Sequence, residues 1–167
     1  MTDLRVGLGY DVHPFADGRP LVLAGVTLDP PGLEGHSDAD AVAHAVADAL
    51  LGPAGLPDLG ALYPASDERY RDASSLELLR GVVGRVSDCG WRVVNVDVVI
   101  AAEQPRLAPH LDAMARNLTS VLGDGVFVSI KPKRGEGMGA IGRAEGIAVW
   151  TVALLQRLEP GPESSAP

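Results

Sequence analysis

The pattern of apolar and polar positions along the chain predicts strands that alternate with helices. Alternating or continuous apolar runs predict strands over residues 3–11, 20–29, 91–102, 126–132 and 145–158. Apolar residues at helical spacing predict helices over residues 36–52, 74–90 and 105–123. This order of elements is typical of the α/β class.

The segment 36–52 carries the clearest helical pattern, and its two faces differ in character. The apolar stripe consists of Val42, Ala45, Val46, Ala49 and Leu50, whereas another face carries Ser37, Asp40, His44 and Asp48. Ser37 and Asp38 stand at cap-like positions, and Gly52 with Pro53 predicts the end of the helix. We expect the stripe to face the core and the polar face to carry the chemistry.

Three other segments bear on how the chain is organised. The Gly- and Pro-rich connection 52–74 is long enough to predict a functional loop, with a helical turn around Leu59–Leu62. The strand predicted over 145–158 is apolar on both faces, so both need a cover, and a neighbouring subunit is one candidate. Residues 159–167 have the composition of disorder, and we expect residues 1–158 to form a single domain.

Composition and charge limit the partners that we expect. The chain has 167 residues, of which 46% are hydrophobic and 4% aromatic, so the core is built mainly from Val, Leu and Ala. A formal charge of −8 argues against nucleic acid, because a phosphate backbone would be repelled. Positive charge gathers at Lys131, Lys133 and Arg134, which we expect in one loop. With no leader-like N-terminus and no bilayer-length apolar run, we expect no membrane association and a cytoplasmic location.

Three histidines lie in segments that suit metal chemistry. Asp11 and His13 are two residues apart on a predicted strand, so their side chains point to the same face. With His44 they offer one carboxylate and two imidazoles, a set that suits catalytic zinc with one open position. Two plainer interpretations stand beside this one. His13 is a hydrogen-bonded surface residue, or His44 is bonded to Asp40 or Asp48, each four residues away.

Several motifs in this order resemble one enzyme family. They are "GYDVHPF" (9–15), "HSDADAVAHAVADALLG" (36–52), "DLGALYP" (58–64), "KPKRGEGMG" (131–139) and "GRAEGIA" (142–148). Together they are similar to the 2-C-methyl-D-erythritol 2,4-cyclodiphosphate synthases, over residues 4–158. The resemblance implies an α/β subunit with a mixed sheet and helices packed on one face, ferredoxin-like or chorismate-mutase-like. It also implies a homotrimer with sites at the subunit interfaces and a single catalytic domain over residues 1–158.

The resemblance also implies an activity and its cofactors. The family, a group of phosphorus–oxygen lyases, cyclises 4-diphosphocytidyl-2-C-methyl-D-erythritol 2-phosphate to 2-C-methyl-D-erythritol 2,4-cyclodiphosphate and releases CMP. This reaction belongs to the non-mevalonate pathway to isoprenoid and terpenoid precursors. The implied metals are one Zn²⁺ per subunit, and Mg²⁺ or Mn²⁺ with the substrate diphosphate.

Site residues carry over position by position from the resemblance. The implied metal ligands are Asp11, His13 and His44 for zinc and Glu136 for the second ion. His36 is implied to stabilise the transition state. The implied substrate-binding set is Asp11, His13, His36, Ser37, Asp58, Gly60, Asp67, Ala102, Pro105, Lys133, Glu136 and Arg143.

One loop departs from the family pattern. Where the family reads "K-A-T-T-T-E", this chain has "KPKRGE", so Lys133, Arg134 and Gly135 replace the threonines that contact the diphosphate. We expect Arg134 to compensate as a catalytic residue, because a guanidinium offers a forked pair of charged donors to phosphate oxygens. The alternative is that Lys133 and Arg134 are solvated charges and the backbone binds the phosphate.

Two other functions compete with the synthase. The same metal set suits a zinc-dependent phosphohydrolase, in which water replaces the internal phosphate as nucleophile. The altered loop suits a non-catalytic trimeric module that binds nucleotides without converting them. All three take a small-molecule ligand.

Overall fold

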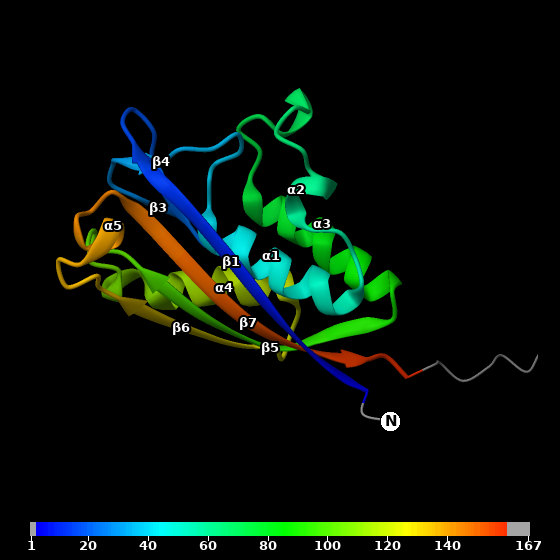
Figure 1. Ribbon diagram of the computed structural model, residues 1–167. Helices are drawn as coiled ribbons and strands as arrows, with labels where there is room; N and C mark the ends of the chain where they lie inside the picture. The colour runs from blue at the N-terminus through cyan, green and yellow to red at the C-terminus, as the bar shows by residue number, and fades with distance from the viewer. Residues whose placement is uncertain (1–2, 160–167) are drawn as a thin grey trace, which may run out of the picture.

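The computed structural model describes residues 3–159, and its centre is a five-stranded sheet in the order β4-β1-β7-β5-β6 (Figure 1). The strands are β1 (Leu4–Ala16), β4 (Gly32–Leu33), β5 (Trp91–Ala101), β6 (Phe127–Lys133) and β7 (Gly146–Arg157). Only β5 and β6 pair in parallel, and α4 (Leu111–Leu122) lies in the crossover between them, as parallel strands require. The predicted mixed α/β sheet is confirmed.

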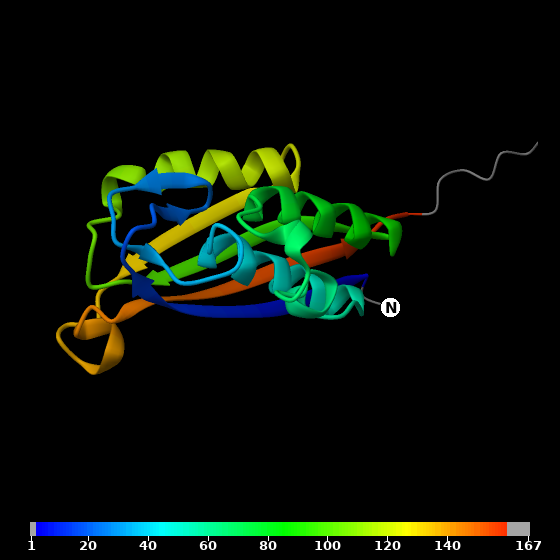
Figure 2. The same ribbon diagram turned by 90° about the horizontal axis from the view of Figure 1, so that it is seen from above.

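The three longer helices pack against one face of this sheet, as Figure 2 shows from above. They are α1 (Ala41–Ala54), α3 (Ser75–Asp88) and α4. The predicted apolar stripe of α1, from Val42 to Leu50, is completely buried in the core between helices and sheet. In the part of the chain that is described, no helix is long and apolar enough to cross a membrane.

The opposite face of the sheet is apolar and open to solvent. Val6 and Leu8 on β1 are 69% and 68% exposed, and Val152 on β7 is 46% exposed. Trp150 lies beside Tyr10 on the same face, with ring centroids 5.2 Å apart. One apolar face of β7 is therefore covered by the helices, whereas its second face has no cover within residues 3–159.

The boundaries of α1 differ from those predicted. The helix begins at Ala41 because the buried Asp40 is its cap and accepts the N–H groups of Val42 and Ala43. It continues past Gly52, because a proline in the last turn removes one backbone donor but does not block the residues after it. It ends at Gly55, whose φ of 78° suits glycine.

Two predicted strands also differ. The segment 20–29 is a hairpin of β2 (Leu21–Leu23) and β3 (Val26–Leu28), because Ala24 and Gly25 both take positive φ and turn the chain. The first strand extends beyond residue 11 to Ala16. Asp11 and His13 therefore lie inside β1, opposite Val149 and Ile147 of β7.

The remaining elements follow the prediction more closely. The helix predicted over 105–123 starts as a 3₁₀ turn (Ala108–His110) before α4. Strand β6 lies at the sheet edge and is not buried, and it contains Lys131 and Lys133, which we expected in a loop. The predicted helical turn is α2 (Leu59–Leu62), followed by a 3₁₀ turn (Glu68–Tyr70), and α5 (Gly139–Gly142) precedes β7. Except for Glu159, the predicted tail lies outside the described residues.

Two glycines of β1 allow α1 to lie unusually close to the sheet. A Cβ atom on Gly9 would stand 1.8 Å from the carbonyl oxygen of Ala45, and one on Gly7 would stand 2.0 Å from that of Ala49. Real side chains do not approach backbone atoms so closely. The strand that carries Asp11 and the helix that carries His44 therefore meet with no side chain between them at these positions.

We predict that Gly9→Ala destabilises the protein by about 2–3 kcal/mol, because the added methyl group forces α1 away from β1. The matched control is Gly84→Ala at an exposed position of α3, where an added Cβ meets nothing within 4 Å. It should leave stability unchanged or raise it by up to about 1 kcal/mol. Urea unfolding midpoints measure both variants, and equal midpoints for Gly9→Ala and wild type would contradict the close packing.

Candidate metal centre and active site

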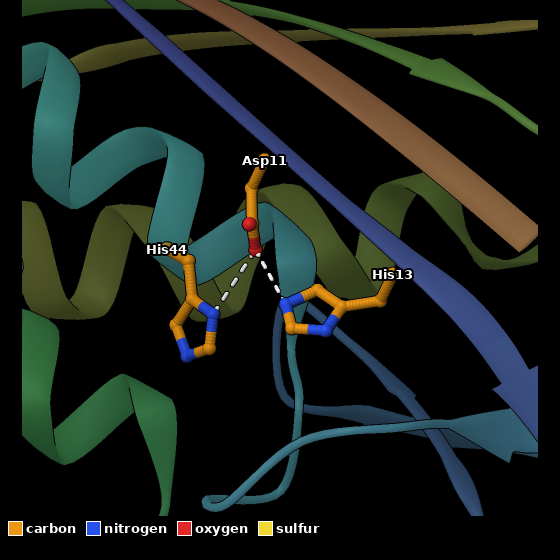
Figure 3. A group of neighbouring side chains, drawn as sticks. All are labelled: Asp11, His13 and His44. Atoms are coloured by element: carbon orange, nitrogen blue, oxygen red, sulfur yellow. Dashed lines mark hydrogen bonds and ion pairs between the residues drawn. The ribbon is translucent and has the colours of Figure 1, made fainter. Parts of the chain in front are cut away.

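Asp11, His13 and His44 form one cluster on the helical side of the sheet. Asp11 Oδ2 lies 2.9 Å from His13 Nε2 and 3.0 Å from His44 Nδ1 (Figure 3). The three ligand atoms all lie within 4.8 Å of one another. Strand β1 supplies the first two residues on one face, and α1 brings the third across the gap that Gly9 leaves open. The predicted shared face of Asp11 and His13 is confirmed.

The electrostatics of the cluster favour an ionised carboxylate. Burial acts to raise the pKa of Asp11, but hydrogen bonds from His13 and His44 outweigh it and hold this pKa well below its ordinary value. The same hydrogen bond to Asp11 raises the pKa of His13, against the opposing effect of burial. Asp11 is therefore negatively charged at neutral pH, as a metal ligand must be.

The plainer interpretation of His44 is wrong, because neither Asp40 nor Asp48 makes a side-chain hydrogen bond to its ring. Asp40 accepts backbone N–H groups at the start of α1 and at Ala24 and Gly25. Asp48 instead accepts the N–H of Leu59 at 2.8 Å. The second ring nitrogen of His44, Nε2, lies 2.9 Å from Ser75 Oγ.

The donor set of the cluster fits a divalent metal ion. His13 Nδ1 donates a hydrogen bond to the carbonyl oxygen of Glu34 at 2.5 Å, so Nε2, which faces Asp11, is the nitrogen that could exchange its proton for a metal ion. Metal-binding imidazoles commonly donate their other N–H to such an oxygen. One carboxylate and two imidazoles leave room for an exogenous ligand, as in catalytic metal sites.

A cavity of about 280 Å³ opens beside the cluster. Among the residues that sequence analysis predicted for the site, its walls bring together Asp11, His13, His36, Ser37, His44 and Gly60. His36 Nε2 lies 3.1 Å from the carbonyl oxygen of Asp67, which places Asp67 at the same rim. Asp58 caps α2 by accepting the N–H of Ala61, so it fixes the turn that carries Gly60.

A second cavity collects a different group of predicted residues. Ala102, Pro105, Lys133 and Arg134 line it, together with Glu103. Arg134 Nε donates to Glu103 Oε1 at 3.1 Å, and the N–H of Gly135 donates to the other carboxylate oxygen at 3.1 Å. The hydrogen bond from Arg134 lowers the pKa of Glu103, although burial opposes this. Arg134 is therefore paired with Glu103, and within one chain it does not line the cavity beside the Asp11–His13–His44 cluster.

Besides Asp58 and Asp67, which lie next to the first cavity, two predicted residues line neither of these two cavities. Glu136 is exposed in the turn between β6 and α5, where it holds a φ of 51° between two glycines. Arg143 donates through Nε to Glu145 at 2.6 Å. One chain thus brings the metal triad to His36 and Ser37, but it does not bring Glu136 into the triad's cavity.

Sequence reasoning missed two residues that hold the site together. Ser75 was predicted only as part of the helix over residues 74–90, yet its hydroxyl contacts His44, and no spacing rule links positions 31 residues apart. Glu103 gave no signal because its partner Arg134 is 31 residues further along the chain. The parallel pairing of β5 with β6, which places Ala101 opposite Lys133, brings these two side chains together.

The chain is similar to known proteins in both sequence and structure. Residues 4–156 match the YgbB family. The chain is 51% identical to the 2-C-methyl-D-erythritol 2,4-cyclodiphosphate synthase of Bordetella petrii, over 92% of this chain and 96% of that protein. A structure of the bifunctional IspDF from Campylobacter jejuni matches with a TM-score of 0.90 and 39% identity, over 95% of this chain and 44% of that one. A Plasmodium falciparum IspF structure in a CDP complex matches with a TM-score of 0.80 and 27% identity, over 95% and 99%.

Proposed function

The chain belongs to the YgbB family as a 2-C-methyl-D-erythritol 2,4-cyclodiphosphate synthase, and from this premise we propose the reaction that it catalyses. The substrate is 4-diphosphocytidyl-2-C-methyl-D-erythritol 2-phosphate. An oxygen of its 2-phosphate attacks the β-phosphorus, and the bond from that phosphorus to the bridging oxygen breaks. The products are the 2,4-cyclodiphosphate and CMP, so the enzyme is a phosphorus–oxygen lyase of the non-mevalonate isoprenoid pathway.

The observation that carries this proposal is the Asp11–His13–His44 cluster beside a cavity. We propose that these residues hold one Zn²⁺, which would neutralise negative charge on the diphosphate oxygens. The attacking and leaving groups both carry negative charge, so positioning and charge neutralisation lower the barrier, and no protein nucleophile is needed. Glu136 is proposed to hold Mg²⁺ or Mn²⁺ with the diphosphate.

The two cavities suit the two ends of the substrate. In this proposal, His36, Ser37, Asp58, Gly60 and Asp67 hold the methylerythritol phosphate, and His36 stabilises the transition state. The cytidine end lies against Ala102 and Pro105, with Lys133, Arg134 and Arg143 near the phosphates. The CDP complex of the Plasmodium falciparum relative supports a nucleotide ligand. The cavity beside the Asp11–His13–His44 cluster, at about 280 Å³, is smaller than the ~300–1,000 Å³ of cavities that usually enclose a whole ligand, so it would hold only one end of the substrate.

The proposed catalytic unit is a homotrimer with sites at the subunit boundaries. The exposed apolar face of β1 and β7 supports self-association, because monomeric proteins rarely expose large contiguous apolar patches. A neighbouring chain would also supply Glu136 and Arg134 to a triad that they do not reach within their own chain. We propose one catalytic domain over residues 1–158 and a cytoplasmic location for the enzyme.

We predict that purified protein with zinc and magnesium converts the cytidyl substrate to the cyclic product and an equal amount of CMP, as followed by ³¹P NMR. His44→Ala should lose the activity, because it removes one ligand of the triad. Inorganic phosphate or a linear product would instead indicate the phosphohydrolase. Binding of CDP without turnover would indicate the non-catalytic module.

Arg134→Ala tests the altered loop in the same assay. If Arg134 contacts the phosphates mainly in the transition state, the variant should lower kcat at least tenfold while CMP affinity changes less than threefold. Arg80→Ala is a matched control, since Arg80 is an exposed arginine on α3 that pairs with Glu77. Equal losses of turnover and CMP affinity would contradict a transition-state role for Arg134.

The oligomer has its own test in light scattering coupled to gel filtration. We predict a mass of three 17.3-kDa chains for the wild type. Leu8→Glu places a charge on the exposed apolar face and should give a folded monomer, because burial of an unpaired carboxylate is costly. Gly84→Glu, on the open surface of α3, is the control and should remain a trimer. An unchanged trimer for Leu8→Glu would exclude this face as the interface.

A further inference from the structure

A chain of hydrogen bonds runs from the metal cluster to the start of α3. His44 Nε2 lies 2.9 Å from Ser75 Oγ, and Ser75 Oγ makes a short hydrogen bond to Asp38 Oδ1. The backbone N–H of Ser75 donates to the other oxygen of Asp38 at 3.0 Å. Ser75 is 1% exposed, so water does not compete for these contacts.

The chemistry of the three groups fixes the direction of this chain. A carboxylate only accepts hydrogen bonds, so the single hydroxyl proton of Ser75 goes to Asp38. Ser75 Oγ then accepts a hydrogen bond from His44, which places a proton on Nε2. The other ring nitrogen, Nδ1, faces Asp11 at 3.0 Å, and a bound metal ion would take the place of the proton that it shares with this carboxylate.

Other contacts of this region are consistent with that direction. Ser37 Oγ lies 3.3 Å from His44 Nε2 and 3.3 Å from Ser75 Oγ, so it is a longer second partner on the same side of the ring. Asp38 is held in place because its Oδ1 also accepts the N–H of Asp40, the cap of α1. The two helix starts thus share one carboxylate.

We propose that Ser75 and Asp38 are positioning residues that accept the Nε2–H of His44 and so orient its Nδ1 towards the metal site. The inference rests on the proposed metal-dependent function. It extends that function to residues that touch neither metal nor substrate. Partners of this kind typically change metal affinity by about 10–100-fold when they are removed.

The first test is Ser75→Ala, with Ser74→Ala as its matched control. Ser74 is the neighbouring exposed serine, and its side chain makes no capping hydrogen bond. Zinc affinity of the chelated protein is measured by competition with a coloured chelator, without substrate. We expect Ser75→Ala to bind zinc about 10–100-fold more weakly and Ser74→Ala to match the wild type.

A second measurement separates positioning from simple loss of stability. In zinc-saturated protein with ¹⁵N-labelled histidine, long-range ¹H–¹⁵N spectra report the His44 Nε2–H and its rate of exchange with solvent. We expect slow exchange in the wild type and in Ser74→Ala, and exchange at least tenfold faster in Ser75→Ala. A merely structural serine would leave this exchange rate unchanged.

Asp38→Asn tests the last link with little change of shape. The amide has one acceptor oxygen for the two donors of Ser75, so its NH₂ group faces one of them and the serine hydroxyl can turn towards His44. We expect weaker zinc binding and faster exchange of the His44 Nε2–H with solvent. Zinc affinity within twofold of wild type in both variants, or an unchanged exchange rate, would overturn the proposal.

The outcome is independent of whether the chain is a synthase. Metal affinity and proton exchange are measured without substrate, so they support or overturn the role of Ser75 even if no cyclic product forms. Conversely, a wild-type protein that binds zinc tightly but makes no cyclic product would overturn the proposed function alone.

Discussion

The whole arrangement depends on the close approach of α1 to β1. Gly7 and Gly9 have no side chains to hold the helix away, so the carbonyl oxygens of Ala49 and Ala45 lie where Cβ atoms would otherwise stand. Asp11 and His13 lie on the same face of β1 as these glycines, two and four residues beyond Gly9. The short separation is what lets His44 reach the carboxylate of Asp11 from a different element. The metal cluster is thus a consequence of backbone packing.

The cluster is also tied to a third element. Asp38 caps the start of α3 through Ser75, while Asp40 caps the start of α1, and the two aspartates lie two residues apart. Any shift of α3 relative to α1 would change the hydrogen bond to His44. The orientation of one ligand therefore depends on the relative positions of two helices and a strand, which a rigid core holds better than a loop could.

The sequence predicted those parts that follow local rules. The i, i+2 relation placed Asp11 and His13 on one face, and the helical stripe from Val42 to Leu50 found the core. It did not predict that Asp40 rather than Ser37 or Asp38 begins the helix, because a cap is decided by which carboxylate the fold turns towards the free N–H groups. The partner of His44 was missed for a similar reason. A contact between α1 and α3 depends on tertiary packing, and nothing in the local pattern encodes it.

The proposed trimer would explain two features at once, namely the separation of the two cavities and the open apolar face of the sheet. Within one chain, the metal triad and the basic end of β6 line different cavities, and Arg134 is already paired with Glu103. A chain of net charge −8 would bind the proposed diphosphate only where cations are concentrated, so the proposed function would require both groups of residues to meet at the same phosphates. Packing of the apolar faces of β1 and β7 around an axis would bury exposed side chains such as Leu8 and Val152. The same packing would bring the basic end of one chain to the triad of the next, so assembly and catalysis would depend on the same contact.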